Sequence, residues 1–176
     1  MVPRHNWFRR NRRGEVVLEL RPDEASFLLR IIGELRSALE QPTDSPVMQR
    51  LFPRAYLDPT EDAKEREYSI IANADLLRTR LDRTQNMLDS LEVIARSKPN
   101  SKLTLSDEQV SEWMGTLNDA RLALGVLIEV DEDVEPEDLS DDDPRRFGLE
   151  VYSLLSYFFG ELVDVASMAM PIEGID

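Results

Sequence analysis

Apolar residues recur every three or four positions along several stretches of this chain, which is the spacing of amphipathic helices. The clearest stretch is residues 106–130, where Ser106 and Gln109 match a capping box and Asp107 and Glu108 add negative charge at the helix start. One side of this predicted helix carries Val110, Trp113, Met114, Leu117, Ala120, Leu124, Leu127 and Ile128. The opposite side, which the pattern predicts to face solvent, carries Ser111, Glu112, Gly115 and Asp119.

Further stretches have the same helical spacing. Pro22 is well placed as a first helical residue, and Ser45 with Pro46 can start a short helical turn. A short helix is predicted at residues 61–71, and Asn73 or Asp75 is a suitable N-terminal cap for the longer helix that follows it. The remaining long helices are predicted at residues 22–41, 73–97 and 144–168. The last has the widest apolar stripe, which includes Phe147, and is predicted to be the most buried.

In the helix predicted at residues 73–97, leucines and an isoleucine mark the buried stripe. Charged residues mark the other side, where we expect contact with solvent. They are Arg78, Arg80, Asp82, Arg83 and Asp89.

The segments between the helices have weaker signals. Residues 15–20 alternate loosely and predict one short strand, residues 98–105 read as a linker, and residues 131–143 as a solvated acidic connection. The predicted fold is therefore all-α, a single-domain helical bundle of four or five main helices with a short N-terminal strand at most. Its boundaries are a basic flexible arm at residues 1–14 and a bundle domain at residues 15–176 that includes the acidic linker.

Charge changes this picture at the two ends of the chain. The net charge is −14, yet residues 1–14 hold five arginines and no acid, whereas residues 129–143 hold ten acids and no base. Most of the surface should repel a phosphate backbone, so direct DNA contact is expected only through the arm. The residues of this nucleic-acid or partner arm are Arg4, Trp7, Phe8, Arg9, Arg10, Arg12 and Arg13. The alternative is that Trp7 and Phe8 pack onto the domain and the arginines stay solvated or meet the protein's own acidic face.

Composition bounds the class of protein. The 176 residues are 41% hydrophobic and 32% charged, and no apolar run approaches the length of a membrane span. We expect a protein of the cytoplasm without membrane association. The chain contains no cysteine, which leaves no material for a disulfide, a thiolate metal site or a thiol redox switch.

Two acidic patterns could bind metal ions. Residues 131–142 mimic the spacing of a calcium loop at Asp131, Asp133, Glu135 and Asp142, but Pro136 replaces the glycine of its sharp turn. A Glu132-x-x-Glu135 pattern followed by Glu161-x-x-Asp164 resembles the magnesium-binding carboxylates of all-α nucleotide pyrophosphohydrolases. We interpret both patterns as solvated acidic surfaces, and we predict no metal, cofactor or catalytic residue.

The other candidate chemistry is sparse. Asn118, Arg121 and Gly125 form a strip at the edge of the apolar side of the helix at residues 106–130. Arg121 needs a polar partner there, and a glycine inside a helix is explained by close approach of another backbone. We predict a structural contact between helices at this strip. The chain's one histidine, His5, lies in the arm, so no histidine-based site is expected.

Two blocks of the chain resemble a known family. The first is RLFPRAYLDP at residues 50–59 followed by DAKEREY at residues 62–68, and the second is WMGTLNDARLALGVLIEV at residues 113–130. In order and spacing, and in the basic N-terminus that precedes a first helix, they resemble an actinobacterial family. That family was formerly catalogued as a domain of unknown function and is now labelled AosR-type oxidative-stress transcriptional regulators.

The resemblance implies a noncatalytic regulatory or adaptor protein that acts on transcription during oxidative stress, with a sigma factor or RNA polymerase component as its partner. A redox-responsive member would use cysteines, and this chain has none. An acidic helical protein is also better suited to a basic partner surface than to gripping DNA alone. The alternatives are an all-α magnesium-dependent nucleotide pyrophosphohydrolase and a structural subunit of a larger complex.

Overall fold

The structure is a computed structural model that describes residues 6–55, 59–98, 102–130, 136, 139–140 and 142–168. The helices in these residues are α1 Pro22–Glu40, α2 Pro46–Leu51, α3 Asp62–Ala95, α4 Asp107–Leu127 and α5 Arg146–Ser167, with a 3-10 turn at Pro59–Glu61. The strands are β1 Phe8–Arg10, β2 Val16–Glu19 and β3 Lys102–Leu105. The described part is thus mainly helical, as the hydrophobic pattern predicts.

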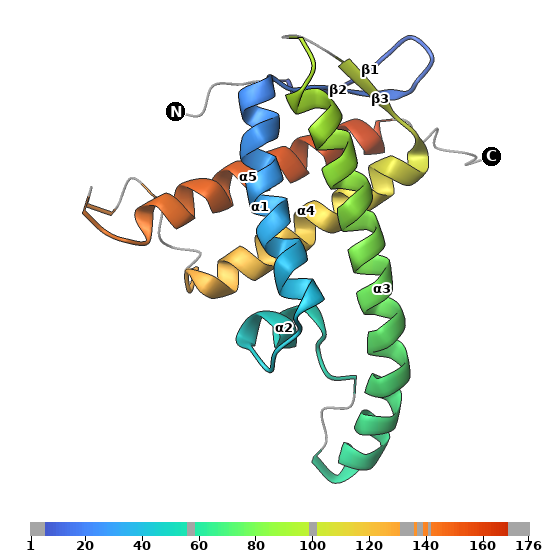
Figure 1. Ribbon diagram of the computed structural model, residues 1–176, viewed down its shortest axis with the longest axis vertical. Coiled ribbons are helices and arrows are strands. Elements are labelled where there is room, and N and C mark those ends of the chain that lie inside the picture. Colours follow the sequence, from blue (N-terminus) through green and yellow to red (C-terminus); the bar gives the residue numbers. More distant parts are fainter. Residues whose placement is uncertain are drawn as a thin grey trace, which may run out of the picture.

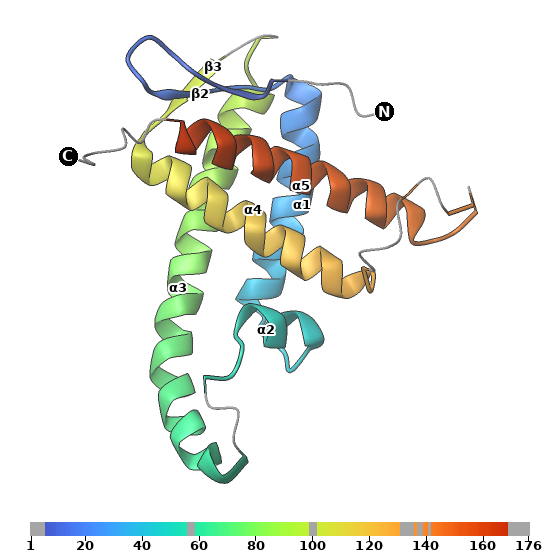
Figure 2. The ribbon, with the colours of Figure 1, turned by 180° about the vertical axis from the view of Figure 1, so that it is seen from behind.

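The long helices form two crossed layers. Antiparallel helices α1 and α3 make one layer, and antiparallel helices α4 and α5 make the other (Figures 1 and 2). Helix α2 lies at the end of α1, and the sheet covers the opposite end of the molecule. Helix α4 contacts α1, α2, α3 and α5. The central helix is therefore α4, and the prediction that the last helix is the most buried was wrong.

Local signals set two helix starts as predicted. Ser106 Oγ accepts a hydrogen bond from the Gln109 backbone N–H at 3.2 Å, and the Ser106 N–H donates to Gln109 Oε1 at 2.9 Å. This is the reciprocal capping box expected at the start of α4. At α1, Pro22 is the first helical residue, and Glu24 Oε2 accepts from the Arg21 backbone N–H at 2.9 Å.

Helix α3 corrects the prediction of two successive helices. It runs unbroken through Asp62–Ala95, so neither Asn73 nor Asp75 starts a new helix. Inside the helix, the Asp75 backbone carbonyl accepts a hydrogen bond from Thr79 Oγ1 at 2.9 Å. Asn and Asp cost only about 0.7 kcal/mol each inside a helix, which tertiary contacts along α3 can offset.

The sheet corrects the prediction of one strand at most. Three antiparallel strands pair in the order β1-β2-β3, with Arg9 opposite Val17 and Val17 opposite Thr104. Strand β3 lies in the segment predicted to be a linker. The strands have only three or four residues each, too few for alternation to identify them, and the central residues Val16–Leu18 are all buried.

The predicted flexible arm is also corrected within the described residues. Trp7 and Phe8 are 7% and 2% exposed, and their rings lie 5.1 and 4.8 Å from the ring of Phe158, centroid to centroid. Phe8 also contacts Trp113 edge-on. The alternative in which both aromatics pack onto the domain therefore describes the structure, because burying them stabilises β1 against α4 and α5. Arg4 and His5 lie outside the described residues.

The last helix is shorter and more exposed than predicted. It begins at Arg146 rather than Pro144, and Asp143 Oδ1 accepts a hydrogen bond from the Arg145 N–H at 2.8 Å in the preceding turn. Phe147, which the pattern places in the apolar stripe, is 62% exposed, as is Tyr157. These two aromatic side chains face solvent because no described element covers the outer side of α5.

Candidate functional site

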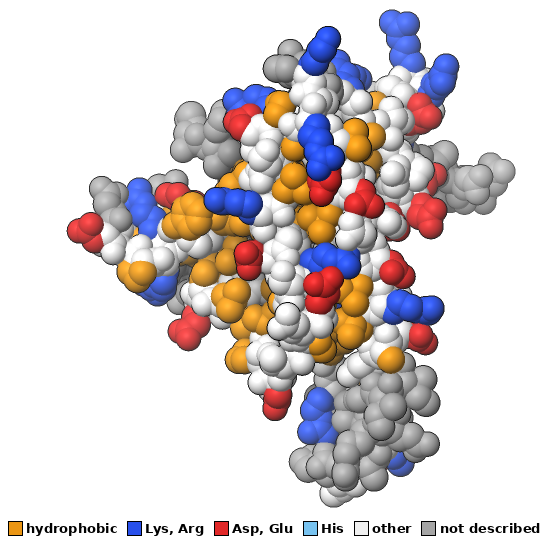
Figure 3. All heavy atoms as spheres, in the orientation of Figure 1, with side chains coloured by type: hydrophobic (Ala, Val, Ile, Leu, Met, Phe, Trp, Pro, Cys, Tyr) orange, Lys and Arg blue, Asp and Glu red, His pale blue; other side chains and the backbone are white. Residues whose placement is uncertain are grey.

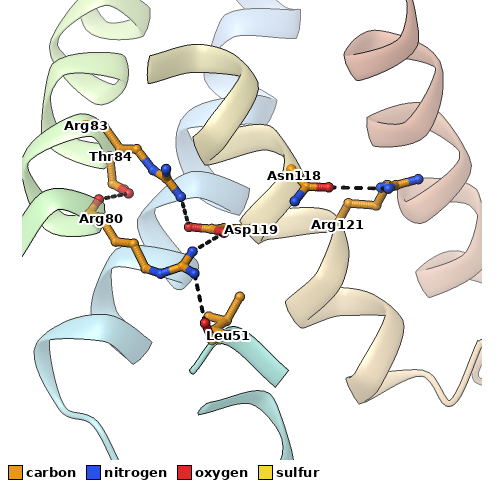
Figure 4. A network of polar contacts seen from close by, with 7 residues as sticks. All are labelled: Leu51, Arg80, Arg83, Thr84, Asn118, Asp119 and Arg121. Carbon is orange, nitrogen blue, oxygen red and sulfur yellow. Dashed lines mark hydrogen bonds and ion pairs between the residues drawn. The ribbon is translucent and has the colours of Figure 1, made fainter. Parts of the chain in front are cut away.

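The strip predicted on α4 faces α5. Arg121 Nη2 donates to Asn118 Oδ1 at 3.3 Å (Figure 4). The Arg121 guanidinium carbon also lies 5.4 Å from the ring centroid of Phe159 on α5. Gly125 is buried, and a Cβ atom there would lie 3.2 Å from Cε2 of Tyr152. The geometry is that of two closely packed helices, with Gly125 making room for a tyrosine ring rather than for a backbone.

A second polar network, which the hydrophobic pattern does not predict, lies on the other side of α4. Asp119 is 2% exposed, and its two carboxylate oxygens accept from Arg80 and Arg83 of α3 (Figure 4). Arg80 also donates to the Leu51 carbonyl at 2.8 Å. The Arg80 guanidinium carbon lies 5.1 Å above the ring centroid of Phe52. One buried carboxylate therefore links α4 to α3, and Arg80 extends the link to the end of α2.

This network corrects two predictions of exposed charge. Arg80 and Arg83 were expected on the solvated stripe of their helix, but their side chains are only 17% and 21% exposed. Asp119 was expected on the exposed side of its helix. Gly115 explains how Arg83 fits, since a Cβ at that position would collide with its guanidinium group. The side of α4 that carries Gly115 and Asp119 thus packs against arginines of α3 instead of facing water.

The electrostatics of the network favour a structural role. Each oxygen of Asp119 already accepts from a guanidinium group, which leaves this carboxylate poorly placed to take a proton from a substrate. The Nε atoms of Arg80 and Arg83 are buried and have no hydrogen-bond partner among the described residues. Two cations therefore share one anion in a largely dehydrated space, and each depends on that anion.

The acidic patterns can be followed only in part. Glu132 and Glu135 of the magnesium pattern lie outside the described residues, as do Asp131 and Asp133 of the calcium pattern. Glu161 Oε1 accepts a hydrogen bond from the Phe8 backbone N–H at 2.9 Å, which ties α5 to β1. Within the part of the chain that the structure describes, no group of three or more metal-binding side chains comes together.

A cavity of about 360 Å³ lies between α2 and α3 and is open to solvent. Its lining consists of Pro42, Met48, Gln49, Phe52, Asn73, Ala74 and Leu77. No titratable side chain is among these residues, so the lining offers no group for acid–base or nucleophilic chemistry.

The predicted arm residues have two different fates. Arg10 is half-buried and donates through Nε to the Val165 carbonyl at 2.8 Å and through Nη2 to the Ala166 carbonyl at 2.9 Å. Arg9, Arg12 and Arg13 are exposed. Lys and Arg side chains gather at the end of the molecule that carries the sheet (Figure 3). The arginines of the arm are therefore part of a folded surface.

These features define a mainly helical protein in which Arg10, Asp119 and Glu161 join one element to another. A family profile described as "Domain of unknown function (DUF2017)" matches residues 4–166. The chain belongs to this family, which confirms the resemblance drawn from residues 50–68 and 113–130.

The chain is also similar to a named protein of Mycobacterium leprae (strain TN). That protein's name describes a candidate oxidative stress regulator, AosR, and the two sequences are 25% identical over 139 residues. The match covers 73% of this chain and 61% of the relative, so this chain spans less than two thirds of the relative's length. No solved structure matches the chain. None of the described helices combines the length and apolar composition needed to cross a membrane.

Proposed function

We propose that this protein is a noncatalytic regulator or adaptor that acts on transcription during oxidative stress. In this proposal it works mainly through contacts with a protein partner, either a sigma factor or a component of RNA polymerase. The observation that carries the proposal is the relative named for oxidative stress regulation, whose match covers 73% of this chain. The match covers only 61% of that relative. The identity of the partner is therefore part of the proposal.

The use of the polar groups supports a noncatalytic role. Asp119 and Glu161 both accept hydrogen bonds that join elements of the fold, and the cavity between α2 and α3 has no titratable lining. A catalytic carboxylate would need a free oxygen directed toward bound substrate. The engagement of Glu161 also weakens the magnesium-dependent nucleotide hydrolase alternative, whose pattern requires this residue as a ligand.

The outer surface of the second layer offers anchors for a protein partner. Phe147 and Tyr157 of α5 are each 62% exposed, and Leu127 at the end of α4 is 71% exposed. Aromatic side chains of this kind contribute most of the energy at many protein interfaces because they bury large area at little entropic cost. A partner that covers α5 would remove them from water.

The signal cannot be read by a thiol of this chain, because the chain has no cysteine. In the proposed mechanism the oxidant is sensed by the partner, and this protein changes what the partner binds. Oxidation of the partner should then change the affinity of the complex. Peroxide treatment of this chain alone cannot change that affinity by forming a disulfide, because the chain has no cysteine.

Recovery of partners from cells at native expression levels tests the proposal. A sigma factor or an RNA polymerase subunit should be recovered with the tagged protein. The double variant Phe147→Ser/Tyr157→Ser should lose that partner. The control Leu76→Ser/Val93→Ser, which changes two exposed apolar residues of α3, should keep it. Recovery of unrelated proteins only would contradict the proposal, and a single stoichiometric complex without transcription components would favour the structural-subunit alternative.

A further inference from the structure

The loop between β1 and β2 is a well-ordered hairpin turn. Asn11 Oδ1 accepts hydrogen bonds from the backbone N–H groups of Arg13 at 2.8 Å and Glu15 at 3.0 Å. The Asn11 N–H also donates to the Glu15 carbonyl at 3.0 Å, closing the loop. Gly14 has a φ of 79°, a conformation that glycine adopts without strain. The turn therefore holds its tip in one shape.

The hairpin is fixed to the body of the protein at its base. Phe8 is buried in the core, and its backbone N–H donates to Glu161. Arg10 binds the carbonyl groups of Val165 and Ala166 at the C-terminal end of α5, where the helix dipole favours a positive charge. Moving the hairpin away would expose the aromatic residues and break these bonds, so its tip has a fixed position.

Three arginines project from this fixed hairpin. Arg9, Arg12 and Arg13 are exposed, and among the described residues their side chains make no hydrogen bond or ion pair. The nearby acids are already engaged, since Glu15 accepts from the Asn11 amide at 2.7 Å and Glu19 pairs with Lys102 at 3.4 Å. The hairpin therefore presents three available guanidinium groups on a backbone that is already fixed before any binding.

We infer that this hairpin binds the phosphate backbone of duplex DNA. Guanidinium groups form paired hydrogen bonds with phosphate oxygens, and a two-stranded ribbon fits the grooves of a duplex. Trp7 and Phe8 are buried, which excludes the base stacking that single-strand binding uses. Residues 9–15 expose no apolar side chain, so the hairpin lacks the aromatic anchor of a protein interface.

The rest of the molecule directs this contact. The net charge of −14 repels a phosphate backbone over most of the surface, so the protein should approach DNA with the sheet end first. The contact would place a protein partner bound at α5 beside the duplex. The placement of a partner beside DNA rests on the proposed function. The binding of the hairpin to duplex DNA does not, because it can be measured with the purified chain.

The three arginines set the expected size of the effect. About three phosphate contacts predict that log K falls with log salt concentration with a slope of about −2.7. Between 50 and 200 mM salt the affinity should therefore fall about 40-fold. No preference between duplexes of different sequence is expected, because phosphate contacts carry no sequence information.

Fluorescence anisotropy with a labelled duplex of mixed sequence tests the inference. The variant Arg9→Gln/Arg12→Gln/Arg13→Gln should bind at least tenfold more weakly at 50 mM salt and lose most of the salt dependence. The control Arg30→Gln/Arg78→Gln/Arg96→Gln removes the same amount of charge from three other exposed arginines. Arg30 lies in α1, Arg78 lies in α3 and Arg96 directly follows α3. It should bind within about threefold of the wild-type protein, since only long-range attraction changes. Circular dichroism should show both variants folded.

Three results would overturn the inference. They are the absence of duplex binding by the wild-type chain at 50 mM salt, equal losses in the two triple variants, and a polyglutamate peptide that competes as well as the duplex. The last result would assign the hairpin to an acidic protein partner. Recovery of the transcription partner by the hairpin variant keeps the two proposals separable, because that recovery depends on α5 and not on the arginines.

Discussion

The substitution Asp119→Ala should destabilise the fold more than an alanine substitution of any exposed acidic residue on the helices. Asp119 is 2% exposed and accepts from Arg80 and Arg83, which come from a different helix. Its removal leaves two guanidinium groups that still occupy the space between α3 and α4 but have lost their anion. Since charged groups in a dehydrated environment are costly without a partner, the folded state loses free energy while the unfolded chain does not.

The magnitude follows from the exposure of the two arginines. Removing one partner of a fully buried ion pair costs about 3–5 kcal/mol. The Arg80 and Arg83 side chains are 17% and 21% exposed, so water can partly rehydrate them after the substitution. We therefore expect a loss near the lower end, about 3 kcal/mol in the free energy of unfolding. For a protein of this size, that loss lowers the melting temperature by about 6–12 °C.

Urea unfolding followed by circular dichroism measures the loss. The matched control is Asp82→Ala, which removes an exposed carboxylate from α3 and should change the free energy of unfolding by less than about 0.5 kcal/mol. A loss below about 1 kcal/mol for Asp119→Ala, or equal losses for both variants, would refute the reasoning. The combined change Arg80→Met/Arg83→Met/Asp119→Leu should recover much of the stability, because no buried charge then lacks a partner.

Three further predictions concern other parts of the fold. Gly125→Ala should yield no net stabilisation in urea unfolding because its Cβ would lie 3.2 Å from a tyrosine ring of α5, whereas Gly160→Ala, with nothing within 4 Å, should gain about 0.5–1 kcal/mol. Acrylamide should quench Trp7 as poorly as Trp113, since they are 7% and 1% exposed, and strong quenching of Trp7 would restore the flexible arm. Hydrogen bonds from the Arg145 side chain and backbone lower the pKa of Asp143 below 3.8. Its contribution to stability is thus present above pH 3.8 and lost as the pH falls through the lowered pKa, so the difference between wild type and Asp143→Asn should disappear in acid.

The helices were predictable because their signals are local. Pro22 and the capping box of Ser106 and Gln109 set helix starts within one turn of the chain, and the structure places α1 and α4 at those starts. The same local reasoning went too far at Asn73 and Asp75. A residue that is favourable as a cap is also tolerated inside a helix when contacts with other elements hold the helix together.

The sheet and the arm depend on contacts between distant residues. Phe8 is buried by Phe158 and hydrogen-bonded to Glu161, partners more than a hundred residues away. No local pattern in a three-residue strand announces those partners. The buried Asp119 is a similar case, because a carboxylate beside small residues looks solvated until Arg80 and Arg83 are known to cover it.

The position of α4 indicates where function should be sought. This helix is buried on its apolar side and also on the small side that holds Gly115, Thr116 and Asp119, so packing constrains most of its residues. Apart from its exposed end at Leu127, the recognisable block at residues 113–130 therefore describes the architecture of the family. A regulator acts through surfaces that its partners can reach, and the outer side of α5 and the arginines of the β1–β2 hairpin are two such exposed surfaces. Variants at these two surfaces should change binding while leaving the fold intact, and variants inside α4 should do the reverse.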